Sequence, residues 1–438
     1  MSPLPLRSIA KVLLALVLIA LALLGILFLT RGTPLATVTG VGEPAGVAPV
    51  GSPDFRRLIE LYTGTSIEPG HEIRVLQDGG MFPLMFAEMR TARRTLTVQI
   101  YYADPGRVAT SLREVLEDRA AAGVRVLFLY DAFGSTLGEA YLDSLRAVGV
   151  TVAQFRPVKW YSLHKAQQRA HTRAVVIDGR IGYTGGFGIA DMWWGGNEDW
   201  PREWRDTNVR FTGPAVAQLQ GAFGISWVEA TGQLLTGELF YPDGAEPGAT
   251  DGADAGARAG VVYSAPAIGS TVAERMLALS IAGASRRLYI ANAYYAPDDD
   301  FRRLLIAAAE RGVDVRILVP GPRTDIPVVR RAGRATYQPL LEAGVRIYEY
   351  LPTMMHSKVL TADGVWSLIG SMNFDNRSLA LNEETVLAID DAGTARILEQ
   401  RILSGIAQAD EITLTEHSER PWHAKLVERA ALLLARVL

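Results

Sequence analysis

The chain has 438 residues, with 44 Lys or Arg against 47 Asp or Glu and a net charge of −3. This length allows two domains of ordinary size, and the nearly even charge offers no basic surface of the kind that binds nucleic acid. The sequence has no cysteine, which excludes disulfides and thiol chemistry.

An uninterrupted apolar run extends from Val12 to Leu29, after the cations Arg7 and Lys11. As a helix it would rise about 27 Å, close to the ~30 Å of a bilayer's hydrocarbon core. We therefore predict an N-terminal transmembrane helix, with a membrane anchor over residues 1–31. A cleaved secretory signal is the alternative, but the run is longer than a usual signal core. The cations before it favour an orientation that leaves the body of the protein outside the cytoplasm, on the cell (inner) membrane.

Two stretches without helical or strand periodicity divide the rest of the chain. Residues 32–53, rich in Gly, Pro, Val and Thr, are predicted to be a spacer, and residues 236–260, rich in Gly, Ala and Asp, a connector. The remaining residues form two predicted units, 54–235 and 261–415, followed by a C-terminal amphipathic helix within 416–438. Such a helix suits either a membrane interface or packing on the core.

The two units repeat one set of elements in the same order. Residues 93–102 are similar to 286–295, and residues 122–129 to 311–318. Each unit is predicted to contain strand, helix, strand, helix and then a motif strand, with the continuous apolar strands typical of sheets buried on both faces. The sequence therefore predicts an α/β fold of two pseudo-symmetric units that share one active-site cleft.

A histidine motif occurs once in each unit. A cation follows the histidine by two residues and an aspartate follows it by seven, which gives His171, Arg173 and Asp178 in the first unit and His356, Lys358 and Asp363 in the second. Small residues come next in both copies: Gly185 and Gly186 in the first, Gly370 and Ser371 in the second, with Asn373 two positions further on.

These residue types in this spacing indicate chemistry on phosphorus. Side chains at i and i+2 of an extended strand face the same way, so the histidine and the cation can meet one ligand. A neutral imidazole can attack phosphorus while the cation holds the negative oxygens. Lys and Arg are poor metal ligands, so no metal or other cofactor is expected. The structural alternative is a pair of buried strands whose His and Asp satisfy one another.

The duplicated pattern resembles the phospholipase D superfamily and, within it, bacterial cardiolipin synthases. The similarity runs from about Glu72 to Leu438 and includes Trp204–Thr207, Gly370–Ser378 and the C-terminal segment from Pro421. It implies transfer of a phosphatidyl group between two phosphatidylglycerol molecules at a membrane, giving cardiolipin and glycerol through a phosphohistidine.

The resemblance also implies roles for individual residues. His171 would be the nucleophile and His356 the acid and base, with Arg173 and Lys358 stabilising the transition state. Asp178 and Asp363 are expected to orient the imidazoles, with Asp206 and Glu384 as weaker candidates for that task. Gly186, Ser371 and Asn373 are expected to contact the phosphate.

Some positions depart from the family pattern. Arg173 replaces a lysine, Gly188 an asparagine and Asn208 a histidine, so the first half-site is the one in doubt. The alternatives are a phospholipase D that hydrolyses phospholipids and a membrane lipid-binding protein with weakened catalysis. A nuclease is disfavoured by the charge balance. The tryptophans near the first motif are expected either at the membrane interface or in packing: Trp193, Trp194, Trp200 and Trp204.

Overall fold

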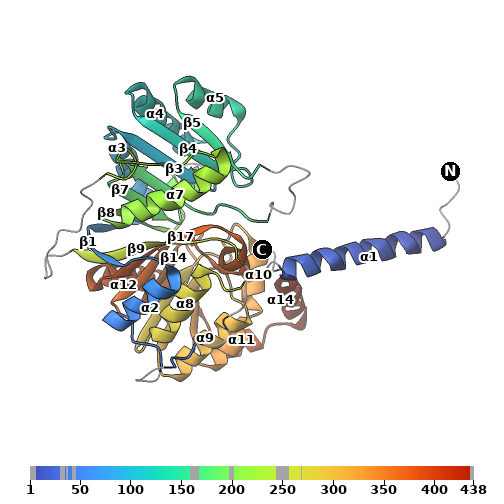
Figure 1. Cartoon of the computed structure of the whole chain (residues 1–438). Helices are drawn as coiled ribbons and strands as arrows, with labels where there is room; N and C mark the ends of the chain where they lie inside the picture. Colours follow the sequence, from blue (N-terminus) through green and yellow to red (C-terminus); the bar gives the residue numbers. More distant parts are fainter. Residues whose placement is uncertain are drawn as a thin grey trace.

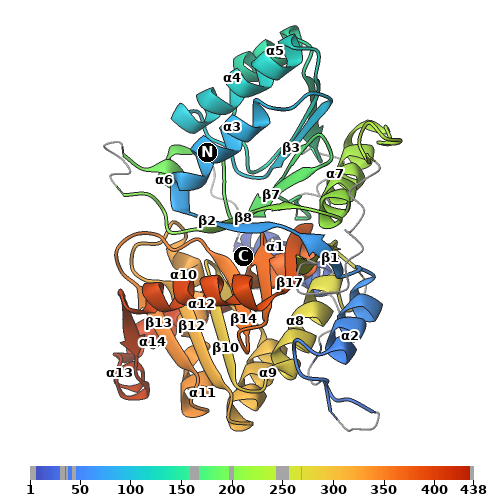
Figure 2. The same cartoon turned by 90° about the vertical axis from the view of Figure 1, so that its left-hand side faces the viewer.

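The structure, a computed structural model, describes residues 6–29, 35, 38–41, 46–157, 167–196, 202–242, 256–267 and 269–434. Two α/β units stack one above the other and meet at a central seam (Figures 1 and 2). The helix α1 (Leu6–Leu29) extends away from both units (Figure 1).

The first unit is built on a sheet in the strand order β2-β8-β7-β6-β3-β4-β5, counted over the described residues. The helices α3, α4 and α5 cover one face with apolar side chains, and α7 covers the other. The elements of this unit are β2 (Ile73–Gln77), the 3-10 turn η1 (Asp78–Gly80), α3 (Met81–Met89), β3 (Thr95–Ile100), α4 (Arg107–Ala121), β4 (Arg125–Asp131), α5 (Glu139–Ala147), β5 (Thr151–Phe155), β6 (Ala174–Ile177), β7 (Ile181–Gly185), α6 (Asp191–Trp194), β8 (Thr207–Thr212) and α7 (Ala215–Thr231).

The second unit has a sheet in the order β1-β9-β17-β15-β14-β10-β12-β13-β18, over the same described ranges. The helices α2, α8, α9 and α11 pack on one face and α12 on the other. Its elements are α2 (Pro53–Thr63), β1 (Glu68–His71), β9 (Ala257–Ser264), α8 (Val272–Gly283), β10 (Arg287–Asn292), β11 (Tyr295–Ala296), α9 (Asp299–Glu310), β12 (Asp314–Pro320), α10 (Pro327–Arg334), α11 (Tyr337–Glu342), β13 (Arg346–Tyr350), β14 (Lys358–Ala362), β15 (Trp366–Gly370), β16 (Phe374–Asp375), the π-helix η3 (Arg377–Leu381), β17 (Glu384–Asp390), α12 (Ala392–Ile406), β18 (Ala409–Ile412), α13 (Leu414–Ser418) and α14 (Trp422–Leu434).

The internal repeat is confirmed by the strand order. The sequence β8-β7-β6-β3-β4-β5 in the first sheet corresponds to β17-β15-β14-β10-β12-β13 in the second. In both units the motif strand, β6 or β14, pairs antiparallel with the first strand of the repeat, β3 or β10. One strand in each unit, β5 or β13, lies between the second helix and the motif strand and was missing from the predicted order.

Two predicted boundaries are wrong. The segment after residue 54 was assigned to the first unit, but β1 pairs with β9 of the second sheet, with Glu68 opposite Ala259. Phe55 of α2 packs edge-on against Trp366 of β15, with ring centres 5.1 Å apart. The predicted connector also extends too far, because β9 already begins at Ala257; residues 243–255 of the connector lie outside the described part.

The seam between the units is itself a hydrophobic core. The apolar side chains of α7 and α12 lie there together with residues from both sheets, including Val176 of β6 and Val359 of β14. Burial of apolar surface at this seam fixes how the two motif strands face each other.

The terminal helices differ from the sequence expectations. In the described part of the chain, no helix is both long and apolar enough to cross a membrane, so the expected transmembrane helix lacks support there. The C-terminal helix α14 packs against α10 through Ala431 and Ala332, and Arg334 pairs with Glu428 at 3.2 Å. Packing on the core therefore accounts for one face of α14, while Trp422 and Leu426 remain exposed.

Candidate active site

The two motif histidines are buried at the seam, each in the segment that leads into its motif strand. His171 precedes β6 and His356 precedes β14, and both side chains are nearly inaccessible, as are Arg173 and Lys358. Because the strands of the two units face each other there, the four side chains share one site.

Each histidine is held by a carboxylate from the opposite unit. His171 Nδ1 lies 2.9 Å from Glu384 Oε1, at the start of β17 in the second unit. His356 Nδ1 lies 3.1 Å from Asp206 Oδ2, just before β8 in the first unit. A carboxylate bound to one imidazole nitrogen fixes the tautomer and leaves the other nitrogen for chemistry. Neither half of the molecule therefore contains a complete site.

Short backbone bridges between the units place each carboxylate beside the histidine of the opposite unit. Ala170 pairs with Glu383, and Arg205 pairs with Met355, each in a single parallel bridge. The amide of Glu383 donates to Arg169 O at 2.8 Å, and that of His356 donates to Arg205 O at 2.7 Å. In both bridges the next residues along the two paired segments are the histidine and its carboxylate, so the bridges position each pair in the same way.

The two cations make equivalent contacts despite their different chemistry. Arg173 donates from Nη1 to the carbonyl of His171 at 2.8 Å, and its Nη2 lies 3.1 Å from His171 Nε2. Lys358 Nζ donates to the carbonyl of His356 at 2.6 Å and lies 3.0 Å from His356 Nε2. The third arm of the arginine, Nε, donates to Phe187 O at 2.8 Å. Arg173 therefore makes the contacts with His171 that Lys358 makes with His356.

Burial decides the protonation of both histidines. It lowers the pKa of His171 to about 4, helped by the charge of Arg173 and opposed by Glu384. Burial and the charge of Lys358 hold the pKa of His356 well below its usual range. At neutral pH both imidazoles are thus uncharged, as a nucleophile or a proton acceptor must be.

The pKa values of the two buried carboxylates shift in opposite directions. Burial alone would raise the pKa of Glu384, but His171 and a hydrogen bond from Ser371 bring it below its usual value. Burial raises the pKa of Asp206 to about 6, although Lys358 opposes this. Burial also lowers the pKa of Lys358 to about 7. Glu384 is therefore the more firmly ionised partner.

The small residues after each motif strand allow the segment that carries each carboxylate to pack closely against them. A Cβ atom on Gly186 would lie 2.4 Å from Asp206 Oδ1, and one on Gly370 would lie 2.1 Å from Thr385 O. Ser371 Oγ donates to Glu384 Oε2 at 2.5 Å, and Asn373 Nδ2 donates to Ser378 Oγ at 3.3 Å. In this structure Ser371 therefore supports the carboxylate, and Asn373 bonds to a neighbouring side chain.

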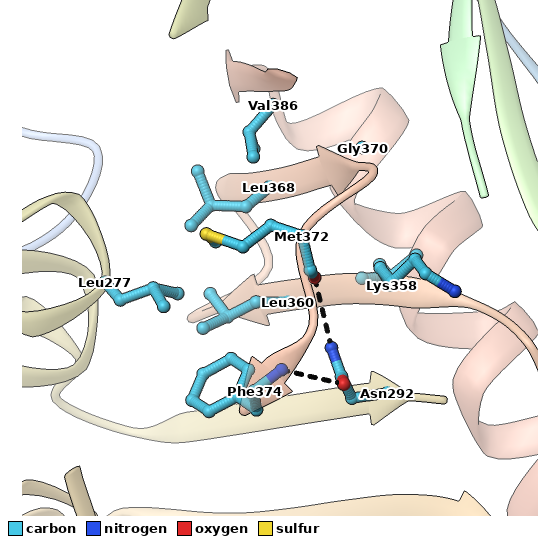
Figure 3. A pocket seen from close by; sticks show the side chains of 10 residues that line it. Leu277, Asn292, Lys358, Leu360, Leu368, Gly370, Met372, Phe374 and Val386 are labelled. Atoms are coloured by element: carbon cyan, nitrogen blue, oxygen red, sulfur yellow. Dashed lines mark hydrogen bonds between the residues drawn. The ribbon is translucent and has the colours of Figure 1, made fainter. Parts of the chain in front are cut away.

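Asn292 fixes the loop that carries Ser371 and Asn373. Its amide nitrogen donates to Met372 O at 3.4 Å and its oxygen accepts from Phe374 N at 2.9 Å. Figure 3 shows this arrangement beside Lys358, whose amine points away from the apolar cavity lined by Leu277, Leu360 and Leu368. The cavity in Figure 3 is thus a core feature behind the site.

The motif aspartates are not where they were expected. Asp178 accepts the backbone amides of Arg93, Arg94 and Thr95, and its nearest bond is 2.8 Å. Asp363 accepts those of Ser285, Arg286 and Arg287, between 2.8 and 2.9 Å. Both have positive φ, +54° and +55°, in the turn at the far end of the motif strand. The prediction that they orient the imidazoles is therefore wrong; Asp206 and Glu384, the weaker candidates, have that contact.

Aromatic residues missed as site residues enclose the histidines. Trp193 donates from its indole to Asp206 Oδ2 at 2.8 Å and packs edge-on against His356, with ring centres 5.0 Å apart. A Cβ on Gly188 would lie 2.7 Å from the Trp193 ring, which explains the glycine at that position. Trp193 and Trp204 are buried, so packing is the correct interpretation for both; Trp200 lies outside the described residues.

Tyrosines at equivalent positions of the repeat also contact the histidines. Tyr101 packs against His171 at 4.8 Å between ring centres, and Tyr294 against His356 at 5.8 Å. The repeated Tyr-Tyr pair after the first strand of each unit, Tyr101-Tyr102 and Tyr294-Tyr295, could have identified these residues from the sequence.

The duplicated fold, with a histidine and a cation from each unit in one buried site, defines the phospholipase D class of proteins. A family model described as "Cardiolipin synthase, PLD-like domain" matches residues 277–404. The cardiolipin synthase of Geobacillus thermodenitrificans (strain NG80-2) is 34% identical over 360 residues, which cover 82% of this chain and 70% of that protein. Cardiolipin synthase A of Pseudomonas putida (strain W619) is 35% identical over 371 residues, 84% of this chain and 75% of the relative.

The fold comparison agrees. The crystal structure of phosphatidylserine synthase from Haemophilus influenzae Rd KW20 aligns with a TM-score of 0.66 at 13% identity, covering 88% of this chain and all of that one (100%). At that identity the likeness concerns the fold alone. The chain belongs to the cardiolipin synthase family of the phospholipase D superfamily.

Proposed function

We propose that the protein transfers a phosphatidyl group between two phosphatidylglycerol molecules, giving cardiolipin and glycerol. The observation that carries this proposal is the exchanged pairing of His171 with Glu384 and of His356 with Asp206 around two buried cations. The names of the relatives support the choice of lipid product.

In the first half-reaction, His171 Nε2 attacks the phosphorus of the donor lipid. A P–N bond forms, the P–O bond to the glycerol headgroup breaks, and His356 gives a proton to the departing oxygen. Arg173 and Lys358 stabilise the negative oxygens of the five-coordinate transition state. The arriving phosphodiester also brings negative charge beside His356, which opposes the cations that lower its pKa and so lets it carry the proton.

In the second half-reaction, the headgroup hydroxyl of another phosphatidylglycerol attacks the phosphohistidine. His356 takes the hydroxyl proton, the new P–O bond forms and the P–N bond breaks, which regenerates His171. Water in place of the lipid alcohol would give phosphatidic acid, so exclusion of water separates the synthase from the phospholipase alternative.

The two carboxylates favour His171 as the nucleophile. A phosphorylated imidazole gains positive character, and an ionised carboxylate at its other nitrogen stabilises that charge. Glu384, with its lowered pKa, is suited to this task, whereas Asp206, with a pKa of about 6, is suited to exchanging a proton with His356.

A product assay on detergent-solubilised protein tests the proposal. Phosphatidylglycerol should yield cardiolipin and glycerol, and His171→Ala and His356→Ala should each lower the rate by at least about 10³-fold. His423→Ala, an exposed histidine on α14, is the control and should behave as wild type. Phosphatidic acid as the main product would favour the phospholipase. No lipid product from wild type would favour the lipid-binding protein.

We propose further that the protein acts at the inner membrane, with its body on the extracytoplasmic side. The exposed apolar side chains of α1, such as Leu13 and Leu14, and those of α14, such as Trp422 and Leu426, support attachment to lipid. Carbonate extraction of membranes should leave the full chain in the pellet and release a chain lacking residues 1–31. Protection from added protease in spheroplasts would contradict the proposed side.

A further inference from the structure

Tyr294 connects His356 to the loop before α10. Its ring packs edge-on against His356, and Lys358 Nζ lies 5.6 Å from the ring centre. Its hydroxyl donates to Asp325 Oδ2 at 2.5 Å. Burial, together with the charge of Asp325, holds the pKa of Tyr294 well above its usual range, so the hydroxyl stays a donor. One tyrosine ring therefore separates Asp325 from the histidine that handles the alcohol proton.

Asp325 lies in the loop before α10. The residue is exposed, and its second oxygen lies 3.5 Å from Thr324 Oγ1. After burial and Asp104, the charge of Asp325 also contributes to the raised pKa of Tyr102 in the first unit. Asp325 thus lies close enough to the first unit for its charge to act on Tyr102.

The surroundings of the equivalent tyrosine beside His171 are more positive. Tyr101 occupies the position equivalent to Tyr294, and the cations that act on it are Arg377, Arg173 and Arg169, against the single carboxylate of Asp131. A phosphate anion is stabilised on that side. On the side of Tyr294, the carboxylate of Asp325 offsets part of the positive charge and accepts hydrogen bonds from neutral hydroxyl groups.

We infer that Tyr294 and Asp325 form the subsite for the hydroxyl-bearing headgroup of the acceptor lipid. This inference rests on the proposed function. Asp325 accepts hydrogen bonds from the glycerol headgroup and directs one hydroxyl to His356, while Tyr294 holds the carboxylate in place. The glycerol headgroup of the acceptor has two free hydroxyl groups, so one can donate to Asp325 while the other reacts. A simple alcohol has one hydroxyl group and cannot do both, so the pair selects for polyols over simple alcohols.

The test is a competition between two soluble acceptors. Wild-type protein receives phosphatidylglycerol as donor with equal concentrations of deuterated glycerol and ethanol, and mass spectrometry measures labelled phosphatidylglycerol against phosphatidylethanol. Asp325→Asn and Asp325→Ala should lower the glycerol-to-ethanol ratio by about tenfold, the loss expected for a charged hydrogen bond. Tyr294→Phe, which keeps the ring against His356, should lower it less. The KM for glycerol should rise in all three variants with little change in donor consumption.

Matched controls come from the first unit, where Tyr102 donates to Asp104 at 2.6 Å. Tyr102→Phe and Asp104→Asn should leave the acceptor ratio at the wild-type value. The inference is overturned if the Asp325 variants keep that ratio, if they lose donor consumption in proportion, or if the controls shift it equally. It is also overturned if wild type forms neither alcohol product. Labelled phosphatidylglycerol without any cardiolipin would instead refute the proposed function and leave the subsite standing.

Discussion

Lys358 and Arg173 have equivalent positions, but burial affects their charges differently. Burial lowers the pKa of Lys358 to about 7, with Arg173 adding to the effect and Asp206 opposing it. A buried guanidinium keeps its proton throughout the physiological range. Above pH 7 the free site therefore loses one of its two cations, and Arg173 alone keeps its charge.

This difference predicts the pH dependence of catalysis. Because the lowered pKa means that the ammonium loses its proton as pH rises through about 7, kcat/KM of the wild type should fall on the alkaline side of that value. Lys358→Arg should show a lower maximum, from its changed geometry, but no fall up to pH 9. The measurement is kcat/KM between pH 5.5 and 9. Lys425→Arg on α14 should keep the wild-type profile. An identical alkaline fall in Lys358→Arg would assign the titration to another group.

We expect the motif aspartates to contribute to the stability of the fold and not to the reaction. Asp178→Asn and Asp363→Asn keep a residue that tolerates positive φ but remove the charged acceptor of several backbone amides. Each should lower the free energy of unfolding by about 2 kcal/mol, as measured by denaturant titration, with an unchanged pH profile of activity. Because the pKa of Asp363 is lowered in the folded state, its stabilisation is complete above the unfolded pKa of about 3.9 and is lost as pH falls through the folded value. A variant that keeps the wild-type free energy of unfolding but loses turnover would show that these aspartates take part in catalysis.

Four of the side chains that lie together in the buried site could be predicted from the sequence, because each motif places histidine and cation two positions apart on one extended segment. It could not predict which carboxylate each imidazole meets. Asp206 and Glu384 come from the opposite unit, and no local periodicity reports a contact across the seam. The aspartates within the motif were given that role because they are near in sequence.

At the scale of elements, hydrophobic runs predicted the alternating strands and helices before each motif strand, and the repeat gave their order. The assignment of α2 and β1 failed because their partners are distant in the chain. Phe55 packs on Trp366, and Arg56 donates to Asp390 at 2.9 Å. An amphipathic helix with a short strand fits either sheet edge by pattern alone, so only tertiary contacts assign it to the second unit.

The assignment of α2 can be tested with one core residue. Phe55→Ala should lower the free energy of unfolding by about 3–5 kcal/mol, since Phe55 is almost fully buried. Hydrogen exchange should then increase in β9 and β15 of the second unit while β3 and β4 stay protected. Phe82→Ala on α3, equally buried, should show the reverse pattern. Loss of protection in the first unit on Phe55→Ala would contradict the corrected boundary.

At the scale of the molecule, the seam contains both a hydrophobic core that joins the units and the candidate active site. The helices α7 and α12 pack with both sheets in one core, and the two backbone bridges beside the histidines cross the same seam. Each unit supplies one histidine, one cation and the carboxylate for the other unit's histidine. A lone unit would lack the carboxylate for its histidine and would expose the apolar side chains of the seam to water, which is costly.

This arrangement predicts the behaviour of a split protein. Fragments 1–249 and 250–438, divided within the segment between Pro242 and Gly256, should be inactive when expressed singly. Co-expressed, they should co-purify and regain most of the phosphatidyl transfer. The buried seam supplies association energy, and so do α2 and β1 of the first fragment, which pack on the second unit. The first fragment carrying His171→Ala should still bind its partner but restore no activity, which separates assembly from chemistry. Activity in a single fragment would mean that it completes a site with a second copy of itself. Catalysis would then not require the pairing of each histidine with the carboxylate of the other unit.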